Sequence, residues 1–87
     1  IINSKKEIVD NIEKYNQAFI KIFSISENEL GEKLEYNSIT AWDSVGHMGL
    51  MAELEETFEI VMDIDDIIDF SSYKKGFEIV SKYGVEL

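Results

Sequence analysis

The sequence predicts an all-α fold: a small four-helix bundle with a long connection between the first and second helices and a short third helix. Three observations support this class. The 87-residue chain contains no proline, apolar residues recur at helical spacing in several segments, and a residue that favours helix N-termini precedes these segments. A chain of this length has room for one hydrophobic core, so we expect residues 1–87 to form a single domain.

The first predicted helix begins near Ser4. Ser4 and Glu7 have the spacing of a capping box, in which each side chain bonds to a backbone N–H group of the other residue. Apolar side chains then follow at intervals of three and four residues, on one helical face: Ile8, Ile12, Tyr15, Phe19 and Ile22. We expect this face to pack into the core.

Residues 24–43 form the long connection. Ser26 and Glu29 repeat the capping-box spacing, and Gly31 is able to end a single helical turn. Residues 33–42 have no helical period. A connection this long is unusual in a small domain and is typical of a functional segment.

Asp43 and Ser44 are both good N-cap residues, so the second helix should begin at one of them. One face of this helix should point inward: His47, Leu50, Met51, Leu54 and Phe58. Another face carries Val45, Met48 and Ala52, with Glu53, Glu55, Glu56 and Glu59 around them. Apolar residues on an acidic helix are either scattered surface residues or a docking strip. Gly46 and Gly49 weaken the helix, and we expect them to keep the surroundings of Ser44 open.

The last part of the chain predicts two further helices. A short third helix is expected over residues 63–70, and Ser71 or Ser72 should cap the fourth. Lys82 lies near the end of the fourth helix, where a positive charge is favourable. The apolar stripe of the fourth helix consists of Tyr73, Phe77 and Val80, with Ile79 and Tyr83 nearby.

The negative charge is confined to the middle of the chain. The sequence has eight basic residues, all lysine, against 18 acidic residues, for a formal net charge of −10. Ten of the acids and no base lie between Lys33 and Lys74. This charge argues against nucleic-acid and membrane-surface roles, and no apolar run is long enough to span a bilayer. We expect a soluble, cytoplasmic monomer whose acidic segment is either a solvated face or a surface for basic partners.

The residues do not predict an enzyme. His47 has no nucleophile beside it in the sequence, so we expect a packed or partly exposed helix residue in preference to a catalytic base. The acidic run 63–66 fails the spacing of a twelve-residue calcium loop, and there is no cysteine for a thiolate site, so no metal site is predicted. Ser44 stands apart from an ordinary capping serine because it follows the long connection and opens the acidic helix. A helix N-terminus also favours an attached anion such as a phosphodiester.

The segment around Ser44 resembles the acyl carrier protein family. Residues 42–50, Trp-Asp-Ser-Val-Gly-His-Met-Gly-Leu, resemble the family's Asp-Ser-Leu attachment motif and the start of its second helix. Residues 54–60, Leu-Glu-Glu-Thr-Phe-Glu-Ile, resemble the Leu-Glu-Glu-x-Phe stretch that follows. The acidic short helix, the serine cap and the last helix match in order and length, so the resemblance covers essentially the whole chain.

The resemblance implies that Ser44 carries 4′-phosphopantetheine, attached covalently from coenzyme A by a phosphopantetheinyl transferase. Asp43 would help to position magnesium during the transfer. The thiol of the arm would hold acyl or aminoacyl intermediates as thioesters. Further partners would be an acyl- or aminoacyl-loading ligase and downstream acyl-processing enzymes with basic docking patches. These partners would bind the second helix through the apolar residues Val45, Met48 and Ala52 and the acidic residues Glu53, Glu55 and Glu56.

The motif also departs from the common family pattern. Val45 replaces the usual leucine, and Gly46 and Gly49 stand where many fatty-acid carriers have acidic residues. This form looks more like the discrete carriers of specialised bacterial pathways, such as polyketide, nonribosomal-peptide, surface-polysaccharide or amino-acid-loading systems. Two other classes remain open at this point: an unmodified acidic helical adaptor that binds basic protein partners, and a small metal-dependent enzyme.

Overall fold

The computed structural model describes the backbone of residues 3–87 and the side chains of residues 9–87. It contains four α-helices and one short 3₁₀ helix: α1 (Asn3–Phe23), η1 (Glu27–Glu29), α2 (Ser44–Phe58), α3 (Ile64–Asp69) and α4 (Tyr73–Ser81). The predicted all-α class is confirmed, as are the long connection and the short third helix. The predicted capping box of Ser4 and Glu7, and the side chain of Ile8, lie outside the described side chains.

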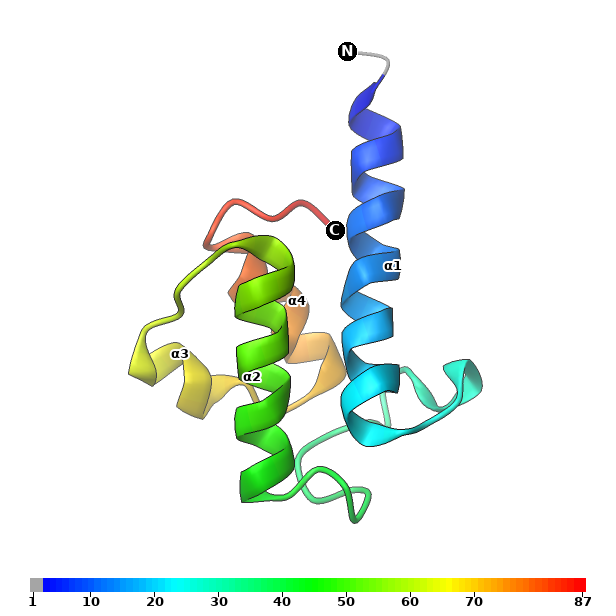
Figure 1. The fold of residues 1–87 in the computed structure, drawn as a ribbon, viewed down its shortest axis with the longest axis vertical. Helices are drawn as coiled ribbons and strands as arrows, with labels where there is room; N and C mark the ends of the chain where they lie inside the picture. Colours follow the sequence, from blue (N-terminus) through cyan, green and yellow to red (C-terminus); the bar gives the residue numbers. More distant parts are fainter. Residues whose placement is uncertain (1–2) are drawn as a thin grey trace.

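α1 and α2 lie side by side and run in opposite directions, with α4 behind them and α3 on the outer side of α2 (Figure 1). The connection between α1 and α2 closes the end of the molecule at which α2 begins (Figure 1). Ser44 therefore lies at the junction of this connection with α2.

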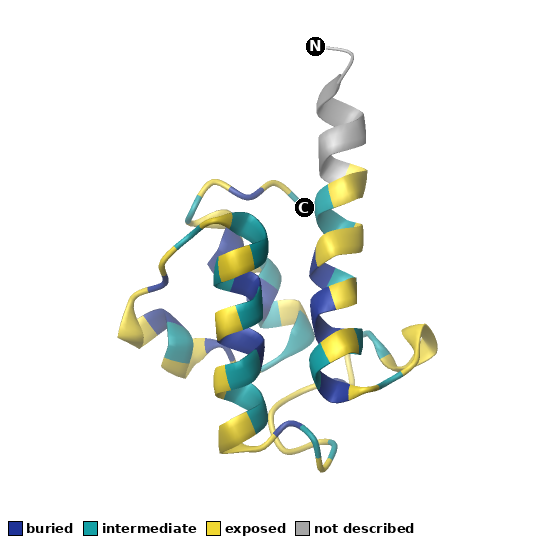
Figure 2. Cartoon of the chain, in the orientation of Figure 1, coloured by how far each residue is buried: buried dark blue, intermediate teal, exposed yellow. Residues whose placement is uncertain are grey.

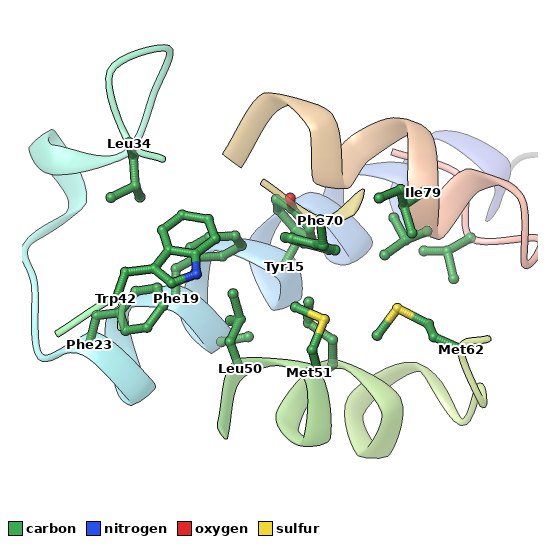
Figure 3. Close-up of a cluster of buried hydrophobic side chains, with 14 residues drawn as sticks. Tyr15, Phe19, Phe23, Leu34, Trp42, Leu50, Met51, Met62, Phe70 and Ile79 are labelled. Atoms are coloured by element: carbon green, nitrogen blue, oxygen red, sulfur yellow. The ribbon is translucent and has the colours of Figure 1, made fainter. Parts of the chain in front are cut away.

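Aromatic side chains fill the core on the side of the connection. Tyr15 and Phe19 of the predicted stripe are buried, whereas Ile12 and Ile22 are only half-buried. α1 also buries Phe23, which the predicted stripe did not include. Trp42, from the connection, is fully buried, and its ring centroid lies 5.1 Å from that of Phe23 (Figure 3). Burying several aromatic side chains gives a domain this small a large share of its stability.

The connection is fixed to α4 by backbone hydrogen bonds. The N–H of Tyr36 donates to the carbonyl of Ser71 and the N–H of Tyr73 donates to the carbonyl of Leu34, both at 2.9 Å. Leu34 itself is buried in the core. These contacts hold the segment before Ser44 as a defined platform, because its backbone groups and its side chains are both anchored.

Polar contacts attach α3 to the end of α4. Among the described residues of α3, Asp66 is the only buried one, and its carboxylate accepts hydrogen bonds from Lys82 and Tyr83. These two hydrogen bonds lower the pKa of Asp66 below its ordinary value, and the one from Lys82 has the larger effect. The Tyr83 hydroxyl also accepts the backbone N–H of Asp63 at 2.8 Å. The orientation of α3 therefore depends on a few polar groups more than on a buried apolar face.

Candidate functional site

The start of α2 is capped by Asp43. Asp43 is extended, and its Oδ1 accepts the backbone N–H of Gly46 at 2.8 Å, in the manner of an N-cap aspartate. Ser44 is consequently the first residue of the helix, and it is exposed. Of the two predicted caps, Asp43 fills the position, so the hydroxyl of Ser44 is not required for capping.

The backbone around Ser44 favours a negative group. The first N–H groups of a helix have no intrahelical acceptor, and they carry the positive end of the helix dipole. The side chain of Asp43 takes the N–H of Gly46, and its carbonyl takes the N–H of His47 at 2.7 Å. The N–H groups of Ser44 and Val45 precede these positions, at the open end of the helix, where an anion attached to Ser44 would be stabilised.

Gly46 allows the connection to approach α2 closely. A Cβ at this position would lie 1.9 Å from the carbonyl oxygen of Ala41, which is far inside any tolerated contact. At Gly49 a Cβ would meet only Ile22, at 3.5 Å. The expectation that both glycines keep the surroundings of Ser44 open is therefore wrong for Gly46. The backbone carbonyl of Ala41 occupies the space that a side chain at position 46 would fill.

A mostly apolar groove of about 410 Å³ opens beside Ser44, between the first turns of α2 and α3. We call it the α2–α3 groove. Ser44 and Tyr36 line it, and the Tyr36 hydroxyl lies 3.1 Å from Ser44 Oγ. The remaining lining residues are mainly apolar: His47, Met48, Ile64, Ile67, Ile68, Phe70 and Ser71.

His47 ties the groove to the core. The Trp42 Nε1–H donates to His47 Nδ1 at 3.0 Å, so this nitrogen carries no proton and the hydrogen-bond network assigns the proton of the neutral ring to Nε2. That Nε2–H donates to the carbonyl of Ile67 on α3 at 2.7 Å. His47 is half-buried and both of its ring nitrogens are hydrogen-bonded within the fold, which agrees with the expected packed or partly exposed helix residue.

Four of the six expected docking residues share one exposed face of α2. Val45 is 81% exposed and Met48 is 56% exposed, and Ala52 and Glu56 are exposed on the same side. Figure 2 shows exposed residues at the N-terminal end of α2 and again along its length. This face lies directly next to Ser44, so a protein that contacts it would also reach the serine.

The other two expected docking residues have intramolecular partners. Glu53 turns toward α1 and forms an ion pair with Lys21 at 3.2 Å. Glu55 turns the other way, and its Oε2 accepts the backbone N–H of Met62 at 2.9 Å. They therefore lie at the two borders of the exposed face and already hold neighbouring segments in place.

Sequence reasoning missed the contribution that α3 and the loop before it make to this surface. Val61, Ile64 and Ile68 are 84%, 73% and 71% exposed, and Ile64 and Ile68 also line the α2–α3 groove. The local pattern gave no signal for this exposure, because residues 64, 67 and 68 have the i, i+3, i+4 spacing of one helical face, which is typical of packing into a core. Tyr36 was also missed, because eight residues separate it from Ser44 and no local pattern links the two.

Metal-ligand clusters and membrane-spanning helices are both absent from the described part of the chain. Among these residues, no three His, Asp or Glu side chains gather closely enough to hold a metal ion. None of the helices described combines the length and the apolar character that crossing a bilayer requires.

Comparisons with protein-family models, with curated proteins and with solved structures found no match.

Proposed function

We propose that this protein is a carrier that holds acyl or aminoacyl intermediates as thioesters on a 4′-phosphopantetheine arm attached to Ser44. The observation that carries the proposal is the placement of Ser44. It is the exposed first residue of a fifteen-residue helix that a neighbouring aspartate already caps. A transferase can reach such a hydroxyl, and the helix N-terminus stabilises the phosphodiester that results.

The composition is consistent with an attached arm. The chain contains no cysteine, so a thioester requires a thiol from elsewhere. The phosphopantetheine group of coenzyme A ends in a thiol, and this thiol would form the thioester. Asp43 is exposed beside Ser44 and would offer a carboxylate oxygen to the magnesium ion used in the transfer.

The surroundings of Ser44 fit such a group. The arm would leave the serine beside the α2–α3 groove, whose walls are mainly apolar. A groove of this kind can shield an aliphatic portion of the arm or of its cargo from water. A flexible tether also raises the concentration of the cargo at each partner's active site.

The charge distribution supports docking to basic partners: the transferase, a loading ligase and acyl-processing enzymes. The exposed face of α2 combines Val45, Met48 and Ala52 with Glu56, and acidic residues continue through α3. Exposed charges of one sign speed the encounter with a partner of the opposite sign and set its orientation, but they add little affinity. We therefore expect brief and salt-sensitive complexes.

The direct test is modification in vitro. The native chain is incubated with coenzyme A, magnesium and a transferase of broad specificity, and the intact protein and its peptides are analysed by mass spectrometry. We expect the mass of one phosphopantetheine, located on Ser44, and no addition to Ser44→Ala. Failure of the folded native chain to accept the group would overturn the proposal.

The second candidate is an unmodified adaptor that binds basic proteins through the same surface. The exposed side chains of Val45, Val61 and Ile64 favour it, because they would suit a permanent protein contact. The modification assay distinguishes the two candidates, because an unmodified adaptor should not accept phosphopantetheine on Ser44.

A further inference from the structure

The Tyr36 side chain is held next to Ser44 from several directions. Its hydroxyl lies 3.1 Å from Ser44 Oγ. Its backbone N–H is bonded to the carbonyl of Ser71, and its ring meets the ring of His47 edge-on, with the centroids 5.7 Å apart. The phenol is therefore not a freely rotating surface group, because both its backbone and its ring are restrained.

Attachment of a phosphodiester to Ser44 would change which partner donates in this contact. In the unmodified protein either hydroxyl can be the donor. After modification Oγ is an ester oxygen without a proton, so only the phenol of Tyr36 can donate. The non-bridging phosphate oxygens are bonded to the same phosphorus as Oγ and carry the negative charge. A hydrogen bond to such an oxygen is stronger than one between neutral groups.

The segment around Ser44 makes a neutral donor useful. No lysine lies between Lys33 and Lys74, and the exposed carboxylate of Asp43 is adjacent to the serine. A phosphodiester here would gain no charge pairing from this segment and would feel repulsion from Asp43. Apart from the open N–H groups of α2, the Tyr36 hydroxyl is the donor that the structure places at Ser44.

We infer that Tyr36 is a phosphate-positioning residue of this carrier. Its hydroxyl donates to a non-bridging oxygen of the phosphate while Ser44 Oγ, whose proton passes to the transferase, attacks the phosphorus that bears the pantetheine arm. The bond from this phosphorus to the rest of coenzyme A breaks, and adenosine 3′,5′-bisphosphate leaves. The Tyr36 hydroxyl keeps its contact with the phosphate in the modified protein. Because Tyr36 also lines the α2–α3 groove, this contact directs the first atoms of the arm toward the groove and away from open solvent. The inference rests on the proposed function, since it requires a phosphodiester at Ser44.

The test compares Tyr36→Phe with the native protein. The substitution keeps the ring against His47 and removes only the hydroxyl. Tyr73→Phe is the matched control, because it also removes one phenol hydroxyl, which is bonded to Asn16 and does not line the groove. All three proteins are modified by the same transferase, and circular dichroism verifies that they are equally helical.

Two quantities are measured on each protein. We expect kcat/KM for the modification of Tyr36→Phe to fall roughly three- to tenfold, the loss of one hydrogen bond at a partly exposed site. We also expect the phosphorus-31 resonance of the modified Tyr36→Phe protein to shift and to become narrower, because the phosphodiester is less restrained. Tyr73→Phe should match the native protein in both quantities.

The outcomes separate the two levels of the argument. If the native protein is modified but Tyr36→Phe keeps either the native kcat/KM or the native phosphorus resonance, the role of Tyr36 is wrong and the carrier function stands. If Tyr73→Phe changes both quantities as much as Tyr36→Phe does, the effect belongs to the fold and the inference also fails. If the native protein is not modified at Ser44, the proposed function and this inference fail together.

Discussion

The same substitution at two glycines of α2 should have opposite effects on stability. Gly46 and Gly49 are three residues apart on one helix, and alanine is the better helix former by about 1 kcal/mol at an ordinary helical position. The difference lies in what the new methyl group would meet. At Gly49 it would touch Ile22 at 3.5 Å, an ordinary van der Waals contact, whereas at Gly46 it would lie 1.9 Å from the carbonyl oxygen of Ala41.

The magnitudes follow from these distances. Gly49→Ala should keep the helix-propensity gain, so the free energy of unfolding should rise by about 1 kcal/mol, or roughly 4–8 °C in Tm for a domain of this size. Gly46→Ala must displace the backbone of the connection by more than 1 Å. Overpacking of this kind costs about 1–3 kcal/mol. After subtraction of the propensity gain of about 1 kcal/mol, we expect Gly46→Ala to bring no gain in the free energy of unfolding and a net loss of up to about 2 kcal/mol.

Urea and thermal unfolding of the native chain and the two variants test this reasoning. Far-ultraviolet circular dichroism reports the helices, and the fluorescence of Trp42, the only tryptophan, reports the connection next to Gly46. Coincident transitions from both probes would justify a two-state analysis. Equal stabilisation by the two alanines would refute the close approach of the connection to α2, and with it the platform described for Ser44.

Three further outcomes are expected. Hydrogen bonds from Lys82, the larger contribution, and from Tyr83 lower the pKa of Asp66. The native chain should therefore be more stable than Asp66→Asn at neutral pH, and this advantage should disappear as the pH falls below about 4 and through the lowered pKa. A difference in stability between the two proteins that does not change with pH would contradict this. His47→Leu should lower the free energy of unfolding by about 2 kcal/mol and alter Trp42 fluorescence, because the Trp42 indole N–H and the Ile67 carbonyl lose their hydrogen-bond partner. An unchanged urea midpoint would argue against these two hydrogen bonds. Raising the salt concentration from about 0.05 to 0.5 M should slow association with the transferase about tenfold in stopped-flow measurements, because the Debye screening length falls from roughly 14 to 4 Å. An association rate that does not change with salt would exclude docking through the acidic side chains.

The local parts of the fold could be predicted from the sequence. Helical periodicity and caps involve residues within about four positions of one another, so a single sequence is enough to recognise them. The stripe through Tyr15 and Phe19, the start of α2 at Asp43–Ser44 and the exposure of Val45 and Met48 all depend on such local relations.

Contacts between distant segments were decided only by the tertiary structure. The sequence shows glycine at position 46, but only the folded chain brings the carbonyl of Ala41 against it. Glu53 and Glu55 both looked like free surface acids, yet one pairs with Lys21 on α1 and the other accepts the N–H of Met62. Such partners depend on how helices pack, and helical spacing does not encode packing.

The same division applies to the candidate site. The sequence by itself determined that a serine opens an acidic helix after a long connection, because cap preference, charge and periodicity are properties of neighbouring residues. The tertiary structure decided what surrounds that serine: the Tyr36 hydroxyl, the groove between α2 and α3, and a histidine whose two nitrogens are already bonded. These groups come from segments that meet only when the connection and α3 fold against α2, so their arrangement depends on long-range packing that no local pattern specifies.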